Sequence, residues 1–144
     1  MKPAPTGVIL FGHGSRLAGA NDHLRAIAER FRTSGRYPLC EAAFLELASP
    51  TMAEAATALV DGGARRLVVV PYFLAIGRHV AEDIPQLVEE TRRALGPEGE
   101  RIPIEVTDIL GNHPAILDLI AMLVEGEPRA GEATVEPPAE VASR

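Results

Sequence analysis

The run RLVVVPYF at residues 66–73 points most directly to the architecture of this chain. Its β-branched residues follow one another without polar alternation, which is typical of a parallel strand covered on both faces. The run GVILFG at residues 7–12 has the same character. We therefore expect two buried parallel strands that belong to one sheet.

Longer amphipathic stretches alternate with these apolar runs. Two further strands are predicted at residues 39–46 and 102–108, and helices at about 20–33, 50–61, 79–95 and 115–124. Ser49 and Pro50 predict an N-cap with proline at the first helical position. Four strand–helix units in succession predict an α/β domain of three layers, with a central parallel sheet of about four strands and helices on both faces.

Length and composition fit one such domain, which we place at residues 1–125 of the 144. Residues 126–144 show no apolar period and are rich in Pro, Gly, Glu and Ala, so a disordered C-terminal tail is predicted there. The formal charge of −6 argues against nonspecific nucleic-acid binding.

One cysteine, Cys40, excludes an internal disulfide, an iron–sulfur cluster held by one chain and a Cys-x-x-Cys zinc site. No apolar run approaches the roughly 20 residues that span a bilayer. No apolar leader with a small-residue cleavage site precedes the first strand. We therefore expect a cytoplasmic protein without a membrane partner.

Polar side chains that can do chemistry follow three of the predicted strands. His13 lies between two glycines after the first strand, Glu46 ends the second, and His79 follows the third. Because the carboxyl ends of parallel strands share one edge of the sheet, we expect the three to face one cleft. Two imidazoles and a carboxylate can bind a late first-row divalent ion with positions left open, or can move protons near neutral pH. The residues alone leave both roles open.

Other residues of the same loops could bind a ligand. Arg16 and Arg78 adjoin the histidines and would supply positive charge to a carboxylate-rich ligand. His113 lies in Asn112-His113-Pro114, where a helix cap and a site role are both open. His23 is assigned to a solvated helix surface beside Asp22 and is set aside.

Four motifs, in order, carry a resemblance to a known family. They are LFGHGSR at residues 10–16, FLE at 44–46, PYFLxxGxHVxxDIP at 71–85 and LGxHP at 110–114. With them the chain resembles the sirohydrochlorin chelatases (class II chelatases) in their short, single-domain form. The motifs span the predicted domain, and the third is the most specific.

The resemblance implies a chelatase-like, flavodoxin-like fold equivalent to half of the two-lobed chelatases, and a homodimer. It implies ATP-independent insertion of Co²⁺, or of Fe²⁺ or Ni²⁺, into sirohydrochlorin, on the way to cobalamin or sirohaem and without an organic cofactor. His13 and His79 match the family's metal-binding, catalytic histidines, and Glu46 matches an acidic position that assists them. Ser15, Arg16, Arg78 and His113 would hold the carboxylates of the tetrapyrrole substrate.

Two other functions stay open from the sequence. A noncatalytic metal- or tetrapyrrole-binding protein would keep the same histidines but show no turnover. A phosphoryl-handling enzyme is the weaker alternative. The GHGSR segment is similar to an Arg-His-Gly phosphohistidine signature, but no arginine directly precedes His13.

Overall fold

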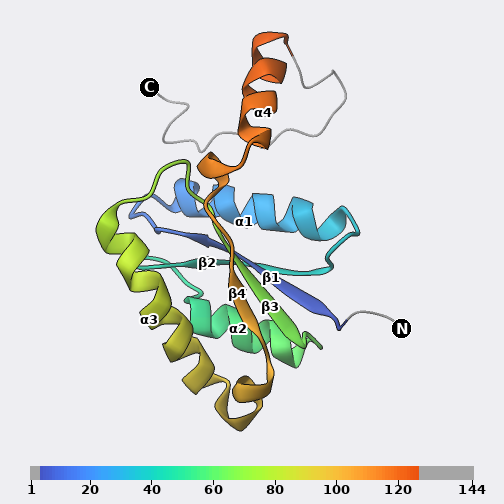
Figure 1. Ribbon diagram of the computed structural model, residues 1–144, viewed down its shortest axis with the longest axis vertical. Coiled ribbons are helices and arrows are strands. Elements are labelled where there is room, and N and C mark those ends of the chain that lie inside the picture. The colour runs from blue at the N-terminus through green and yellow to red at the C-terminus, as the bar shows by residue number, and fades with distance from the viewer. Residues whose placement is uncertain (1–3, 127–144) are drawn as a thin grey trace.

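A four-stranded parallel sheet lies at the centre of the computed structural model, which describes residues 4–126. Its strands are β1 (Thr6–Gly12), β2 (Leu39–Phe44), β3 (Arg66–Pro71) and β4 (Ile104–Val106). Their order across the sheet is β2-β1-β3-β4, and every neighbouring pair is parallel (Figure 1). The predicted α/β class and parallel sheet are confirmed. Because β1 lies between β2 and β3, the loops that follow these three strands are neighbours.

Helices cover the two faces of the sheet unequally. Helix α1 (Ala18–Thr33) packs on one face, while α2 (Met52–Asp61) and α3 (Arg78–Ala94) pack on the other (Figure 1). Two short 3₁₀ helices, η1 (Gly96–Arg101) and η2 (Leu110–Asn112), flank β4, and α4 (Ala115–Val124) follows. The predicted order of strands and helices is confirmed.

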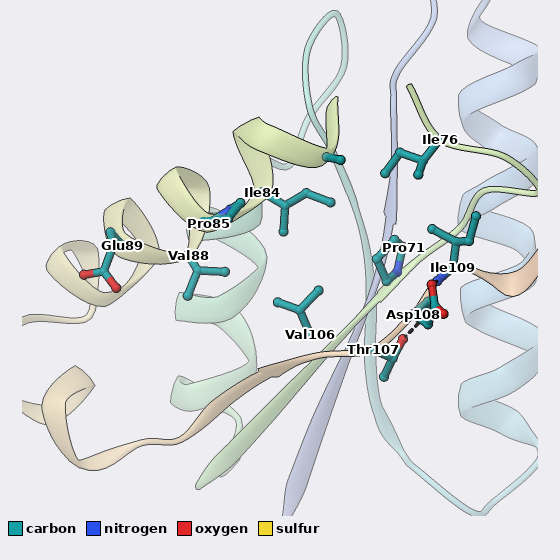
Figure 2. Close-up of a pocket in the computed structure, with 11 residues that line it drawn as sticks. Pro71, Ile76, Ile84, Pro85, Val88, Glu89, Val106, Thr107, Asp108 and Ile109 are labelled. Carbon is teal, nitrogen blue, oxygen red and sulfur yellow. Dashed lines mark hydrogen bonds between the residues drawn. The ribbon is translucent and has the colours of Figure 1, made fainter. Parts of the chain in front are cut away.

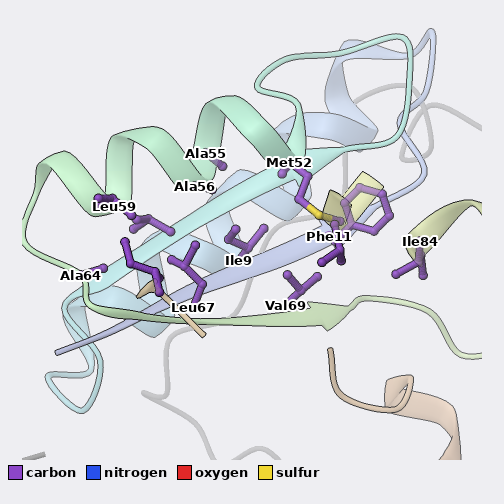
Figure 3. Close-up of a cluster of buried hydrophobic side chains, with 14 residues drawn as sticks. Ile9, Phe11, Met52, Ala55, Ala56, Leu59, Ala64, Leu67, Val69 and Ile84 are labelled. Atoms are coloured by element: carbon purple, nitrogen blue, oxygen red, sulfur yellow. The ribbon is translucent and has the colours of Figure 1, made fainter. Parts of the chain in front are cut away.

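Strand β1 divides its side chains between two cores. Ile9 and Phe11 point toward α2 and α3, and Val8 and Leu10 point toward α1, as the two-residue period of a strand requires. Figure 3 shows the first core, in which Met52 of α2 lies beside Phe11 of β1. The continuous apolar runs of the sequence therefore result from burial on both faces.

The start of α2 differs from the prediction of a Ser49 cap. Thr51 is the N-cap: its side chain accepts a hydrogen bond from the Glu54 backbone, and the Glu54 side chain accepts one from the Thr51 backbone. This reciprocal capping box satisfies two amides that a Ser49 cap would leave open. Pro50 belongs to the preceding loop instead, where its carbonyl accepts a hydrogen bond from Phe44. The Ser49–Pro50 peptide bond is cis.

Three strands are shorter than predicted. β2 ends at Phe44, β3 ends at Pro71, and β4 has only 3 residues. β4 lies at the edge of the sheet and pairs with β3 alone, so its flanking residues have no second neighbour to extend the ladder.

Helix α4 covers neither face of the sheet, which corrects the prediction for the last strand–helix unit. It projects beyond the end of the sheet and packs mainly against η2 (Figure 1). None of its residues is buried. Four strand–helix units predict a helix on the sheet here, but an apolar pattern does not show what covers a helix.

The predicted tail, residues 126–144, lies outside the described residues apart from Gly126. Within residues 4–126, no helix combines the length and the apolar character needed to cross a membrane.

Candidate functional site

His13 and Glu46 are brought together by backbone pairing that continues past the ends of β1 and β2. The Gly12 carbonyl accepts a hydrogen bond from the Leu45 amide (2.9 Å), and the His13 carbonyl accepts one from the Glu46 amide (3.1 Å). The two side chains then meet, with His13 Nε2 3.8 Å from Glu46 Oε1. Both are about half exposed, at 50% and 56%, so the pair can be reached from solvent.

Gly14 makes this close approach possible. Its φ is +91°, and a Cβ placed on it would lie 1.7 Å from the carbonyl oxygen of Glu46. Glycine is the residue that permits both this positive φ and this close approach. What approaches Gly14 is the backbone of the neighbouring loop. Gly12 is closely packed against a side chain, since a Cβ there would lie 2.7 Å from the Leu24 side chain.

Asn21, which the sequence reasoning missed, holds the loop that follows His13. Its side-chain oxygen accepts a hydrogen bond from the Ser15 amide (2.9 Å), and its side-chain nitrogen donates one to the Ser15 carbonyl (2.8 Å). Asn21 is buried in the first turn of α1. The signal was present, because Asn21 lies three residues before Leu24 on the inward face of the helix.

Ser15 also has a local role. Its hydroxyl oxygen accepts a hydrogen bond from the Leu17 amide (3.1 Å) just before α1 begins. The hydroxyl proton remains available to a ligand, because a hydroxyl both donates and accepts.

His79 is the second residue of α3, and Arg78 is the first. Both are exposed. Across residues 4–126, no group of three or more His, Cys, Asp or Glu side chains is placed to hold a metal ion. The structure therefore pairs His13 with Glu46 but does not bring the predicted set of three ligands together. His79 comes from a separate loop and helix. That loop is joined to β1 where it begins, by a hydrogen bond from the Tyr72 amide to the Phe11 carbonyl (2.8 Å).

His113 is a cap in this structure. Its Nδ1 accepts a hydrogen bond from the Ala115 amide (3.0 Å) at the start of α4. This fixes Nδ1 as the acceptor and leaves the hydrogen on the exposed Nε2. Of the two roles that the sequence left open, capping is confirmed, and Nε2 can still donate to a ligand.

The loops after β3 and β4 are joined by a backbone hydrogen bond and a close backbone contact. The Gly111 amide donates a hydrogen bond to the Phe73 carbonyl (3.1 Å), and a Cβ on Gly111 would lie 1.7 Å from the Leu74 carbonyl oxygen. Asp108 shapes the same turn, because its carboxylate accepts hydrogen bonds from the Ile109 amide and the Asn112 side chain.

His23 is not the solvated residue that the sequence suggested. It is half-buried, and its Nδ1 is buried without a hydrogen-bond partner among the described residues. No site residue contacts it through a hydrogen bond or ion pair in the described chain.

Three exposed leucines, here called the rim leucines, lie one in each of the first three strand-to-helix loops. They are Leu17, Leu47 and Leu74, exposed by 47%, 56% and 70%. Leu47 directly follows Glu46 and has a φ of 65°, an uncommon conformation for a residue other than glycine. The edge that carries His13 and Glu46 therefore combines half-exposed polar groups with apolar surface.

This arrangement can bind a cation and accept protons. One imidazole and one carboxylate offer nitrogen and oxygen donors with open positions around them. A neutral imidazole and an ionised carboxylate can also accept protons.

Residues 7–126 match the sequence profile of the CbiX family. Among curated proteins, the chain is 37% identical over 114 residues to the chloroplastic sirohydrochlorin ferrochelatase of Arabidopsis thaliana, covering 79% of this chain and 49% of the relative. It is 38% identical over 81 residues to the sirohydrochlorin cobaltochelatase of Methanocaldococcus jannaschii, covering 56% of this chain and 57% of the relative. The matches thus span only about half the length of these curated relatives. A sirohydrochlorin cobaltochelatase of Methanococcoides burtonii is 31% identical over 118 residues, which cover 79% of this chain and 90% of that relative.

Solved structures have the same fold. A CbiX protein of Marinobacter aquaeolei VT8, named for cobalamin (vitamin B12) biosynthesis, superposes with a TM-score of 0.66 at 28% identity, covering 85% of this chain and 100% of that one. The sirohydrochlorin chelatase SirB of Bacillus subtilis subspecies spizizenii, in complex with cobalt, has a TM-score of 0.67 at 28% identity, covering 83% of this chain and 50% of that one. Together with the profile match over nearly all of the described residues, these likenesses show that the chain belongs to the CbiX family.

Proposed function

We propose that this protein inserts a divalent cation into a sirohydrochlorin-type tetrapyrrole without ATP. The observation that carries the proposal is the exposed His13–Glu46 pair, with Nε2 and Oε1 3.8 Å apart on the edge where His79 also emerges. Relatives named as sirohydrochlorin cobaltochelatase and ferrochelatase support the same reaction.

The cation is a substrate in this proposal, and Co²⁺, Fe²⁺ or Ni²⁺ fits the donors. Imidazole suits late first-row ions, and two protein ligands leave several positions open. A full set of protein ligands would bind the ion so tightly that its transfer to the macrocycle would be slow. A pair of ligands, His13 and Glu46, with His79 as the third when the substrate is bound, suits an ion that must be released.

Two pyrrole N–H protons must leave as the dication enters the ring. An imidazole titrates near neutral pH and can take such a proton when it is neutral. We assign this role to His13 or His79, with the Glu46 carboxylate as the second acceptor. Two protons leave for each dication inserted, so charge is balanced without ATP or an organic cofactor.

The substrate's carboxylates need positive or donating groups. Arg16 and Arg78 are exposed, and neither forms a hydrogen bond or ion pair with another residue of the described chain. Both guanidinium groups are therefore available for bidentate pairing with a carboxylate. The Ser15 hydroxyl and the His113 Nε2–H supply further donors. The rim leucines would contact the apolar face of the macrocycle.

We propose further that two copies of the chain form a homodimer. The match with SirB covers 83% of this chain but 50% of that one, which supports a second copy in place of the other half. The cytoplasm is the compartment that we propose, since a chain with one cysteine has no internal disulfide to maintain.

The test is an insertion assay with sirohydrochlorin and a panel of divalent ions, followed by absorbance. His13→Ala is expected to abolish insertion with the fold retained by circular dichroism, and Glu46→Gln is expected to slow it. His23→Ala is the matched control, because no hydrogen bond or ion pair links this histidine to His13 or Glu46 in the described chain, and it should leave insertion unchanged.

Unchanged cobalt insertion by His13→Ala would remove the assignment of that residue. A spectral shift on binding the macrocycle, with no metal inserted by the unaltered protein, would favour a noncatalytic binding protein instead.

A further inference from the structure

Leu47 combines a disfavoured backbone conformation with an exposed side chain. Its φ is 65°, and it is the one residue other than glycine with a positive φ among the described residues. The left-handed conformation is unfavourable for a leucine and suits glycine or asparagine. Its side chain is 56% exposed, whereas the neighbouring Leu45 and Ala48 pack against the two cores. Packing within the described chain therefore gives no reason for a leucine at this position.

The loop around Leu47 is held on both sides. On one side is the backbone hydrogen bond from Glu46 to the loop after β1. On the other, the Arg25 guanidinium of α1 donates a hydrogen bond to the Ser49 carbonyl (2.8 Å) and lies 5.0 Å from the centre of the Phe44 ring. A strained residue persists where the surrounding contacts fix its backbone. The exposed side chain of Leu47 is thereby held in one place before any ligand binds.

Leu47 lies on the edge of the sheet that carries the candidate metal ligands. It directly follows Glu46, whose Oε1 is 3.8 Å from His13 Nε2. The rim leucines come from loops that also carry Arg16 and lead to Arg78, and neither guanidinium has a hydrogen bond or ion pair within the described chain. This edge therefore offers apolar surface with positive charge beside it, which suits a large apolar ring with carboxylates at its periphery.

An alternative apolar surface is the groove between α3 and β4, which has a volume of about 470 Å³. Figure 2 shows Ile84 and Val88 of α3 facing Val106 of β4 across this groove. The charged residues of its lining are both acidic, Glu89 and Asp108. Because like charges repel, the groove suits a ligand that carries carboxylates less well than the edge with the rim leucines does.

We propose that the Leu47 side chain contacts the face of the tetrapyrrole macrocycle and so fixes its position beside the His13–Glu46 pair. The inference rests on the proposed function and adds a residue that determines affinity for the substrate. An apolar ring would cover the half-exposed side chain, and removing this apolar surface from water is favourable. A leucine here thus lowers the stability of the free protein and raises its affinity for the macrocycle.

Glycine substitutions measure the conformational cost. Leu47→Gly relieves the left-handed conformation, so the folded-to-unfolded ratio in urea unfolding should rise by about 2- to 10-fold. Leu74→Gly is the matched control, because this rim leucine does not have a positive φ. This variant should instead lower the ratio by about 2- to 5-fold, since glycine loses more freedom on folding. A Leu47→Gly variant less stable than the unaltered protein would overturn the proposal, because the leucine would then have a structural reason.

Titration with metal-free sirohydrochlorin, followed by absorbance, measures the contact. Leu47→Ala keeps an L-residue in the loop but removes most of the apolar surface, so the macrocycle should bind about 5- to 10-fold more weakly. Leu47→Met keeps an apolar side chain of similar size and should bind within about 2-fold of the unaltered protein. Val106→Ala in the groove is the control and should leave the affinity unchanged. Circular dichroism checks that each variant is folded.

Binding is measured without a metal ion, so the two proposals can fail separately. An unaltered protein that binds the macrocycle but inserts no ion would contradict the proposed function, and weaker binding by Leu47→Ala would still support the contact. Unchanged affinity in Leu47→Ala would overturn the inference. So would an equal loss of affinity in Val106→Ala, because the macrocycle would then occupy the groove.

Titration with Co²⁺ alone separates a contact from an effect on the metal ligands. Leu47→Ala should bind Co²⁺ with the affinity of the unaltered protein, since the side chain that it shortens is not a ligand. A loss of Co²⁺ affinity that matches the loss of macrocycle affinity would also overturn the inference, because Leu47 would then act through Glu46.

Discussion

Replacing Gly14 by alanine tests how the site is built. In the structure, the new Cβ would lie 1.7 Å from the Glu46 carbonyl oxygen, and the φ of +91° disfavours any L-residue. The left-handed conformation alone costs about 1–2 kcal/mol. To relieve the contact, the two loops must also separate. This separation would lengthen or break the Gly12–Leu45 and His13–Glu46 backbone hydrogen bonds.

Each of those hydrogen bonds contributes about 0.5–1.5 kcal/mol. Gly14→Ala should therefore lower the free energy of unfolding by about 2–5 kcal/mol. Gly35 offers a matched control, because its φ is also +91° and a Cβ there would meet nothing within 4 Å. Gly35→Ala should cost only the conformational part, about 1–2 kcal/mol.

The assays are urea unfolding for stability and cobalt insertion into sirohydrochlorin for activity. A displacement of about 1 Å between His13 and Glu46 should reduce insertion by about 100-fold. Gly35→Ala should insert metal at the unaltered rate. Equal losses of stability in the two variants, or full activity in Gly14→Ala, would refute the reasoning.

Two further predictions follow from single side chains. Asn21→Ala removes both hydrogen bonds to Ser15, so it should lower the free energy of unfolding by about 1–3 kcal/mol and slow insertion. Asn21→Asp keeps the acceptor, so its stability and insertion rate should lie between those of Asn21→Ala and the unaltered protein. Equal stability and insertion rate in the two variants would contradict this prediction. Burial raises the pKa of the Cys40 thiol from 9.0 to about 11. The folded protein therefore keeps a proton that the unfolded chain loses, so the free energy of unfolding should fall as pH rises from about 9 to about 11. Unfolding curves over that range should show the slope, and Cys40→Ala should reduce it.

Much of the fold follows from local pattern. The uninterrupted apolar runs at residues 7–12 and 67–71 indicate strands covered on both faces, and helices between parallel strands must cross over the sheet. Sequence periodicity also placed α1 to α3 correctly to within a few residues. The exact ends of the helices were less predictable. Both Ser49 and Thr51 are residue types that cap helices, and only the reciprocal hydrogen bonds with Glu54 identify Thr51 as the N-cap of α2.

The candidate site was predictable only in part. His13 and Glu46 follow neighbouring strands, and parallel pairing alone predicts that they meet. His79 emerges from the next strand, but its distance from the pair depends on the path of a loop, which periodicity does not describe. The role of Asn21 is not predictable from its residue type, because an asparagine on a helix is usually exposed and its two hydrogen bonds to Ser15 form only when the loop folds back.

The order of strands and helices and the residues at each strand end could thus be predicted from the sequence, because the apolar period acts over a few positions. The close approach of Gly14 to the Glu46 backbone and the uncovered position of α4 depend on contacts between distant segments. Such contacts depend on how loops pack in three dimensions. An apolar helix therefore looks the same in sequence whether it covers its own sheet or points away from it.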